Sequence, residues 1–266
     1  LNDITFRAIE VLKSSDVIIC ENPKHSIKLL SKFDIKKKLI SIHDYNEEEI
    51  IDKIKETLKN NKFSLISDAG SPLISDPGYK LVRFCIANGI NVTVVPGPSA
   101  VTSALQISSI PINKYSFYGF LPKSKKGINE FIEMIGADNL TSVFFVSSHK
   151  ILTCIEGLSN KLSDRKIAVC KELTKLNERV FIGNSHEVLE EFKKSSKNTL
   201  GEFVVLVEGA SNQKKSKSVI NYETIEVIQK LLVKFSLTDT VEIVHKIGNI
   251  GKKQLYEKVL EIQNEI

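Results

Sequence analysis

Tryptophan is absent from this chain of 266 residues, methionine occurs once, and cysteine occurs only four times. The cysteines, Cys20, Cys85, Cys154 and Cys170, lie far apart and form no C-x-x-C pair. This spacing predicts neither a disulfide scaffold nor a metal site, and it favours a reduced, cytoplasmic setting. No apolar run approaches the roughly 20 residues that span a bilayer, and no signal peptide opens the chain, so we expect no membrane attachment.

A strong charge of one sign is also lacking. Lysine and arginine number 37 against 32 aspartates and glutamates, which leaves a net charge of +5. This mild excess permits a polyanionic partner without requiring one. With 42% hydrophobic residues, the chain has enough apolar side chains for one large or two modest domains. A disordered or collagen-like chain is excluded.

Strands and helices alternate over residues 1–113. The apolar residues Ile4, Ala8 and Leu12 have the spacing of one helix face, and Asn46 is a predicted N-cap before three glutamates. Short runs rich in branched apolar residues predict strands over 16–20, 39–42, 63–67 and 90–95. This alternation predicts a mostly parallel sheet with helices on both faces.

Residues 114–212 predict a second, mixed α/β domain. Its segments 165–172 and 179–182 are joined by a short connection, so we expect them to pair antiparallel. The polar stretch 211–218 reads as a linker, and residues 213–266 predict a small helical domain. The expected fold class is therefore α/β, with two α/β domains and a helical tail.

Two loops rich in glycine and proline follow neighbouring predicted strands, at residues 67–78 and 96–100. Ligands of open α/β sheets bind beyond the carboxyl ends of the strands, where both loops are expected. Taken singly, each loop is equally well explained as an ordinary turn. No phosphate-binding loop, dinucleotide fingerprint, zinc-protease motif or nucleophile elbow occurs, which weighs against those classes of enzyme.

Segments 68–78, 95–100 and 119–123 closely resemble the tetrapyrrole-methylase-like family, within it the members that act on ribosomal RNA. Shorter matches at 3–8, 172–175 and 201–202 extend the resemblance from Leu1 to about Gly209. In that family a first strand with a glycine-containing loop precedes the segment that begins at Asp3. We expect that strand to be missing from this chain, which starts with leucine.

The resemblance implies a homodimer of chains that hold S-adenosylmethionine in a cleft between two α/β domains. It also implies methyl transfer to the 2′-hydroxyl of a cytidine in small-subunit rRNA, either free or in the assembled subunit. In this reading Asp68 faces the cationic sulfonium, and Val146 and Leu173 flank the adenine. The candidate cofactor-binding residues are Asp68, Ala69, Gly70, Ser71, Pro96, Gly97, Ser99, Ala100, Val146 and Leu173. No metal ligand is expected.

A ribose hydroxyl is a weak acid, so a base or a nearby cation assists its deprotonation. The candidates for this role are Glu21, Glu172 and Lys175. Candidates for binding RNA are Lys24, Lys123, Lys125, Lys126, His149 and Lys150. Segments 20–26, 145–150 and 172–178 depart from the family pattern more than the cofactor loops do, and we hypothesise that the acceptor side has drifted.

Two alternatives stay open at this point. The acceptor is a tetrapyrrole precursor in the first alternative, although lysine-flanked loops do not suit a wide apolar cleft. In the second, the chain binds RNA without catalysing methyl transfer. The tail around Gly248 and Gly251 resembles a helix–turn–helix, and either contact with RNA or capping of the second domain is compatible with it.

Overall fold

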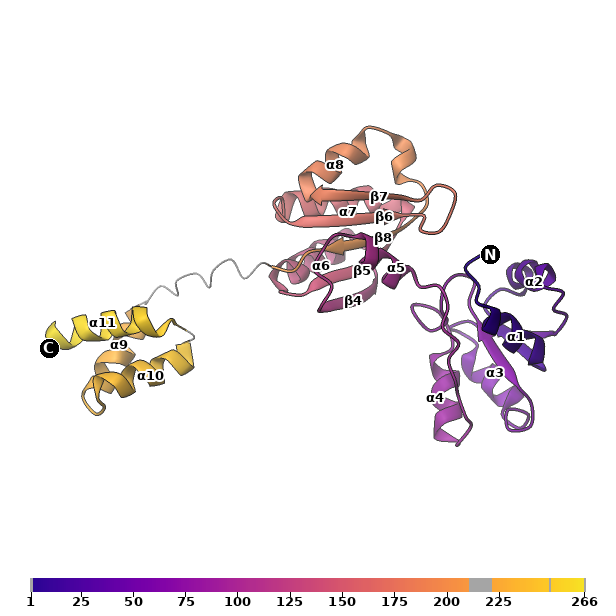
Figure 1. The fold of residues 1–266 in the computed structure, drawn as a ribbon, viewed down its shortest axis with the longest axis horizontal. Helices are drawn as coiled ribbons and strands as arrows, with labels where there is room; N and C mark the ends of the chain where they lie inside the picture. The colour runs from indigo at the N-terminus through magenta and orange to yellow at the C-terminus, as the bar shows by residue number, and fades with distance from the viewer. Residues whose placement is uncertain (1, 211–221, 249, 266) are drawn as a thin grey trace. The chain divides into compact units, whose positions relative to one another are not determined.

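The computed structural model describes residues 2–210, 222–248 and 250–265. They fall into two compact units, Leu1–Gly209 and Ala210–Ile266 (Figure 1). The predicted linker 211–218 lies outside the described residues. Within the described ranges, no helix is both long and apolar enough to cross a membrane. All four cysteines are free and buried.

The first unit begins with a parallel sheet whose strand order is β2-β1-β3. Its strands are β1 (Val17–Cys20), β2 (Lys38–Ser41) and β3 (Phe63–Ile66). Its helices are α1 (Phe6–Ser14), α2 (Pro23–Lys32), α3 (Glu47–Ile54) and α4 (Tyr79–Ala87). Successive side chains of β1 point to opposite faces, so Ile18 packs with Leu12 and Leu30 while Ile19 packs with Ile51 and Leu81. This confirms the predicted parallel sheet with helices on both faces.

The strand predicted over residues 90–95 is wrong. No described strand pairs with this segment, and β3 forms the edge of the three-stranded sheet. Val92 and Val94 are instead 43% and 81% exposed. Alternating branched residues favour an extended backbone, but a strand also needs a neighbour for its hydrogen-bond ladder. Arg7 Nη2 donates a hydrogen bond to Val94 O at 3.3 Å.

A five-stranded mixed sheet with the order β4-β5-β8-β6-β7 follows. Its strands are β4 (Tyr115–Phe120), β5 (Thr141–Ser147), β6 (Lys166–Lys171), β7 (Arg179–Asn184) and β8 (Glu202–Val207). Only the β4–β5 pair is parallel, and the β6–β7 pair is antiparallel as predicted. A 3₁₀ turn, η1 (Ser196–Thr199), precedes β8. The predicted mixed α/β character is therefore confirmed.

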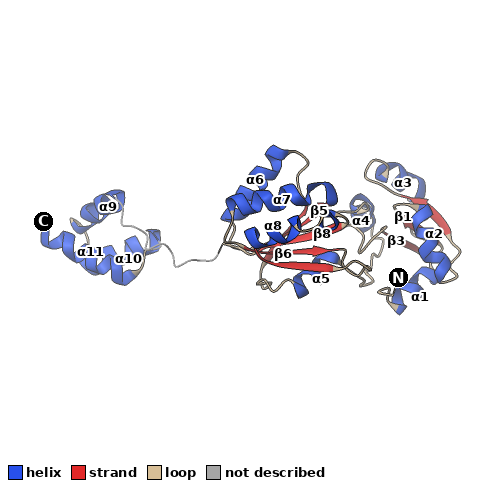
Figure 2. Cartoon of the chain, turned by 90° about the horizontal axis from the view of Figure 1, so that it is seen from above, coloured by secondary structure: helices blue, strands red, loops and turns tan. Residues whose placement is uncertain are grey.

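Helices cover both faces of this sheet (Figure 2). On one face lie α6 (Lys125–Ala137), α7 (Ser148–Lys161) and α8 (Ser185–Lys193). The opposite face carries α5 (Ala100–Ile107), whose Val101 and Leu105 pack with Ala168 and Leu206. Helix α5 belongs to the predicted first domain by sequence, yet it packs on the second sheet. The domain boundaries at 113 and 212 stay predictions.

The second unit contains α9 (Tyr222–Leu232), α10 (Leu237–Gly248) and α11 (Lys252–Glu265). Ile228, Val244 and Leu255 from the three helices form its apolar core. Ser236 immediately precedes α10, and its Oγ accepts a hydrogen bond from the Asp239 N–H at 3.2 Å. The predicted helical character of the tail is confirmed.

Candidate functional site

The two glycine- and proline-containing loops lie against each other in the first unit. Ser71 Oγ donates a hydrogen bond to Pro98 O at 3.1 Å, and a Cβ atom added to Gly70 would lie 3.7 Å from the same oxygen. Leu73 and Ser75 have φ values of 71° and 67°, a left-handed conformation that non-glycine residues rarely adopt. Such strained residues gather at functional sites, where the surrounding structure holds them in place.

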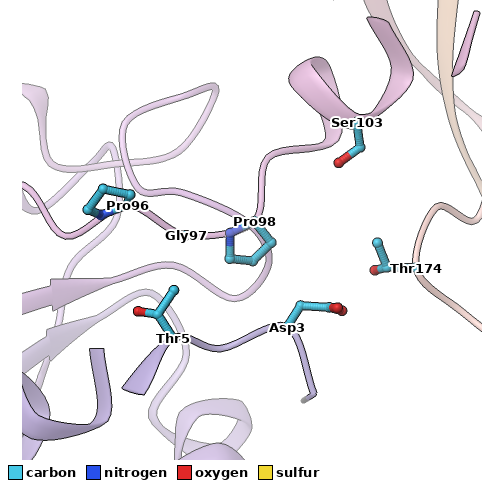
Figure 3. Close-up of a pocket in the computed structure, with 7 residues that line it drawn as sticks. All are labelled: Asp3, Thr5, Pro96, Gly97, Pro98, Ser103 and Thr174. Atoms are coloured by element: carbon cyan, nitrogen blue, oxygen red, sulfur yellow. The ribbon is translucent and has the colours of Figure 1, made fainter. Parts of the chain in front are cut away.

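A hollow of about 370 Å³ opens beside the second loop. It is lined by Asp3, Thr5, Pro96, Gly97, Pro98, Ser103 and Thr174. Thr174 comes from the turn between β6 and β7 and lies across the hollow from Thr5 (Figure 3). The pocket thus joins the N-terminal segment, the second loop and a turn of the second sheet. Its volume is in the range of small-molecule sites.

Carboxylates gather at the carboxyl ends of the first sheet. Glu21 follows β1, and Asp68 follows β3 and accepts a hydrogen bond from the Asn22 N–H at 3.3 Å. Burial raises the pKa of Asp76 to about 6, the charges of Glu21, Asp68 and Asp44 add to this, and a hydrogen bond with Ser67 opposes it. The cluster creates a negative potential that attracts a cationic ligand.

Glu47 was not recognised as part of this region from the sequence. This residue is 4% exposed, and its carboxylate accepts hydrogen bonds from the N–H groups of Gly78 (3.1 Å), Lys80 (2.9 Å) and Leu81 (3.3 Å). It therefore caps α4 and closes the end of the 67–78 loop. Asn46 does stand at the N-cap position of α3, but its Oδ1 accepts from the His43 N–H at 2.7 Å. The one indication in the sequence is Gly78 at the N-cap position of α4. Glycine has no side chain with which to cap the helix, so a residue from elsewhere in the chain has to do so.

Two of the proposed catalytic residues, Glu172 and Lys175, are engaged with each other. Glu172 Oε1 accepts from the Glu202 N–H at 2.9 Å and from Lys175 Nζ at 3.0 Å. Burial raises the pKa of Glu172, but the bond from Glu202 and the Lys175 ammonium outweigh it and lower the pKa. Burial lowers the pKa of Lys175, and the two carboxylates outweigh it and raise the pKa. Both groups are thus tuned away from proton exchange at neutral pH.

The candidate adenine contacts Val146 and Leu173 lie on opposite faces of the second sheet. Val146 is 2% exposed and belongs to the core under α6, α7 and α8. Leu173 is half-buried and packs on the face that carries α5. Residues of β5 alternate between the two faces, and the side chain of Val146 points away from the face on which Leu173 and α5 lie.

Most candidate RNA-binding residues lie at one end of the second sheet. Lys123, Lys125 and Lys126 are exposed at the start of α6. Lys150 Nζ donates to Pro122 O at 3.3 Å, which brings α7 to the same segment. His149 is exposed on α7, whereas the exposed Lys24 lies on α2 beside the first sheet.

Comparison with known proteins defines the class. Residues 1–189 match the family described as tetrapyrrole (corrin/porphyrin) methylases. The fold resembles crystal structures of diphthine synthase (TM-score 0.57, 16% identity, 78% of this chain and 85% of that chain) and of the methyltransferase CobJ (0.56, 13%, 79% and 90%). The chain belongs to the tetrapyrrole methylase family, which confirms the predicted family, fold class and methyltransferase character.

The chain is also similar to curated proteins named ribosomal RNA small subunit methyltransferase I. The protein of that name from Thermotoga maritima is 39% identical over 79% of this chain and 93% of its own length. The one from Escherichia coli O157:H7 is 34% identical over 99% of this chain and 92% of its own length.

Proposed function

We propose that this protein methylates small-subunit rRNA with S-adenosylmethionine as the methyl donor, and that the acceptor is the 2′-hydroxyl of a cytidine. One observation carries the proposal. The similarity to relatives named for small-subunit ribosomal RNA reaches 34% identity over 99% of the chain, whereas solved structures of the same fold with other names are only 13–16% identical. The exposed lysines at the start of α6 suit a polyanionic acceptor such as rRNA.

The residues present fit this cofactor. S-adenosylmethionine would supply a methyl group bonded to a positively charged sulfur, which a negative potential stabilises. The carboxylate of Asp68 would face that charge, with Glu21 and Asp76 nearby. The cofactor would be held by Ala69, Gly70, Ser71, Pro96, Gly97, Ser99 and Ala100, with Leu173 against its adenine. Val146 would stabilise the second sheet from its apolar core and would not contact the cofactor directly.

Holding the nucleophile in line with the bond that breaks supplies much of the acceleration in such a transfer. A general base is most effective with a pKa near the working pH, and Asp76, with a pKa raised to about 6, meets this condition better than Glu172 or Lys175. We therefore assign the ribose proton to the carboxylates around Asp76, including Glu21, and assign Glu172 and Lys175 to holding the turn after β6.

Lys24, Lys123, Lys125, Lys126, His149 and Lys150 would bind the phosphates of free rRNA or of the assembled subunit. We further propose that the enzyme works as a homodimer in the cytoplasm, where ribosomal subunits are assembled. Light scattering of the purified protein measures this state, and a monomer at all concentrations would contradict the dimer.

The test uses purified full-length protein, labelled S-adenosylmethionine, and small subunits or rRNA from cells without the gene. Mass spectrometry of the nucleosides is expected to show one new 2′-O-methylcytidine. Asp68→Asn should lose most transfer and cofactor affinity, whereas Asp52→Asn, which alters an exposed ion pair with Lys55, should keep both. Transfer to a porphyrin precursor instead would overturn the proposal, and so would RNA binding without any transfer.

A further inference from the structure

Three phenylalanines form a cluster at the end of the second sheet. The ring centroid of Phe145 lies 5.1 Å from that of Phe117 and 5.3 Å from that of Phe120, with edge-on and tilted geometries. Phe117 and Phe145 are half-buried, but Phe120 is 63% exposed. Two rings thus support a third whose surface is open to solvent.

An irregularity in the sheet presents this third ring. Phe117 pairs with Val143 and Phe120 with Phe145, so β4 holds one residue more than β5 between these pairs. The extra residue is accommodated at Gly119, whose φ is +68°. A bulge of this kind re-aims the side chain that follows it. Without it, the alternation of β4 would place Phe120 on the opposite face from Phe117.

The presented ring lies beside both the strained loop and the basic segment. A Cβ atom added to Gly119 would lie 3.5 Å from Ser75 Oγ of the 67–78 loop. The exposed lysines Lys123, Lys125 and Lys126 follow Phe120 within six residues. Among the described residues, Lys126 pairs with Glu130 at 3.8 Å, and neither Lys123 nor Lys125 has a carboxylate partner.

We infer that Phe120 is a substrate-binding residue that stacks on an unpaired base of the RNA substrate, next to phosphates bound by Lys123 and Lys125. Exposed aromatic rings flanked by cations are the means by which proteins bind single-stranded nucleic acid, because every base offers a face for stacking. The concentration of lysines at this end of the sheet argues for RNA over a second copy of the chain, since like charges would repel. The inference rests on the proposed rRNA substrate and names the residue that contacts its base.

The test compares Phe120→Ala, Phe120→Trp and the control Tyr115→Ala, which removes a 43% exposed ring from the opposite end of β4. The KM for small subunits should rise about tenfold to a hundredfold in Phe120→Ala, the range expected for loss of one stacked base. In Phe120→Trp the KM should stay close to that of the parent, because tryptophan also stacks on bases. In Tyr115→Ala the KM should stay within twofold of the parent value. Thermal stability should fall only slightly in the two alanine variants and little in Phe120→Trp, because Phe120 and Tyr115 are 63% and 43% exposed.

Calorimetry and a binding assay separate this inference from the proposed function. The affinity for S-adenosylmethionine should be the same in Phe120→Ala as in the parent. An unpaired fluorescent RNA 12-mer should bind more weakly to Phe120→Ala with an unchanged salt dependence, whereas Lys125→Ala should reduce that dependence. Because this assay needs no turnover, it tests the stacking even if the parent methylates no rRNA. An unchanged RNA affinity, a lower cofactor affinity or an altered oligomeric state in Phe120→Ala would each overturn the inference.

Discussion

Substituting Glu47 by alanine tests whether one buried carboxylate holds the candidate cofactor loop in place. The change removes the acceptor of three N–H groups at the start of α4, and those of Gly78 and Leu81 are buried. A buried donor left without a partner destabilises the fold by about 1–3 kcal/mol. Two such donors are left without a partner in Glu47→Ala. Loss of the helix cap, worth about 1 kcal/mol, is partly the same effect, so we expect the free energy of unfolding to fall by about 3–5 kcal/mol in total.

A loss of this size is a large fraction of the total stability of a domain. For a unit of about 200 residues it corresponds to a fall in Tm of roughly 10 °C. Glu47→Gln keeps one acceptor oxygen and should lie between the alanine variant and the parent. Urea unfolding followed by circular dichroism gives the free energies, and amide exchange of residues 78–81 should accelerate in the variants.

The neighbouring glutamate is the matched control. Glu48 is also in the first turn of α3, but its side chain is 79% exposed and its partner is Lys80 Nζ at 2.6 Å. Exposed ion pairs contribute about 0–1 kcal/mol, so Glu48→Ala should be nearly neutral. If Glu47→Ala unfolds at the same urea concentration as Glu48→Ala, the assignment of Glu47 as the cap of α4 is refuted.

Three further predictions follow from the packing. The pKa of Asp76 is raised from 3.8 to about 6 on folding, so the stability of the parent falls as the pH rises through this window. Asp76→Asn should therefore raise Tm relative to the parent at pH 7.5 but not at pH 3.5, and it should lower kcat. Gly201→Ala should lower the free energy of unfolding in urea by at least about 2 kcal/mol, because φ is +113° and the new Cβ would lie under 3 Å from the Glu172 carboxylate. The control Gly89→Ala has a φ of +68° but open space around the new Cβ, and it should lower this free energy by only about 1 kcal/mol. Ile132→Ala should lose about 2–5 kcal/mol by the same measurement, and Met134→Ala, with a half-exposed side chain, under 1 kcal/mol.

The regular elements were predictable because the local pattern and the tertiary environment agree. Short branched runs form β1, β2 and β3, and the short connection between β6 and β7 makes that pair antiparallel. The position of the 67–78 loop was predictable for a similar reason, because it follows β3 and parallel strands bring their carboxyl ends to one edge. The 96–100 loop follows no described strand, and its contact with the first loop through Ser71 and Pro98 could not be derived in this way.

Other features depend on distant contacts that no local pattern encodes. Residues 90–95 have strand-forming residues but no neighbouring strand, and α5 follows the second loop yet packs on the second sheet. The face to which Val146 points follows from the register of β5, which sequence alone did not provide. Glu47 fits its own helix as an ordinary N-terminal acid, and only the approach of α4 makes it a cap.

The disagreements between local preference and structure concentrate around the site. Leu73 and Ser75 adopt left-handed backbone conformations that destabilise a free peptide by about 1–3 kcal/mol each, so the loop cannot be shaped by its own sequence. Ser71 fixes it to Pro98 on one side, and Glu47 fixes its end at Gly78 on the other. The bulge at Gly119 then places an aromatic ring beside it. A surface assembled from separately anchored, strained pieces is already organised before a ligand arrives, and such preorganisation is the property that catalysis by positioning requires.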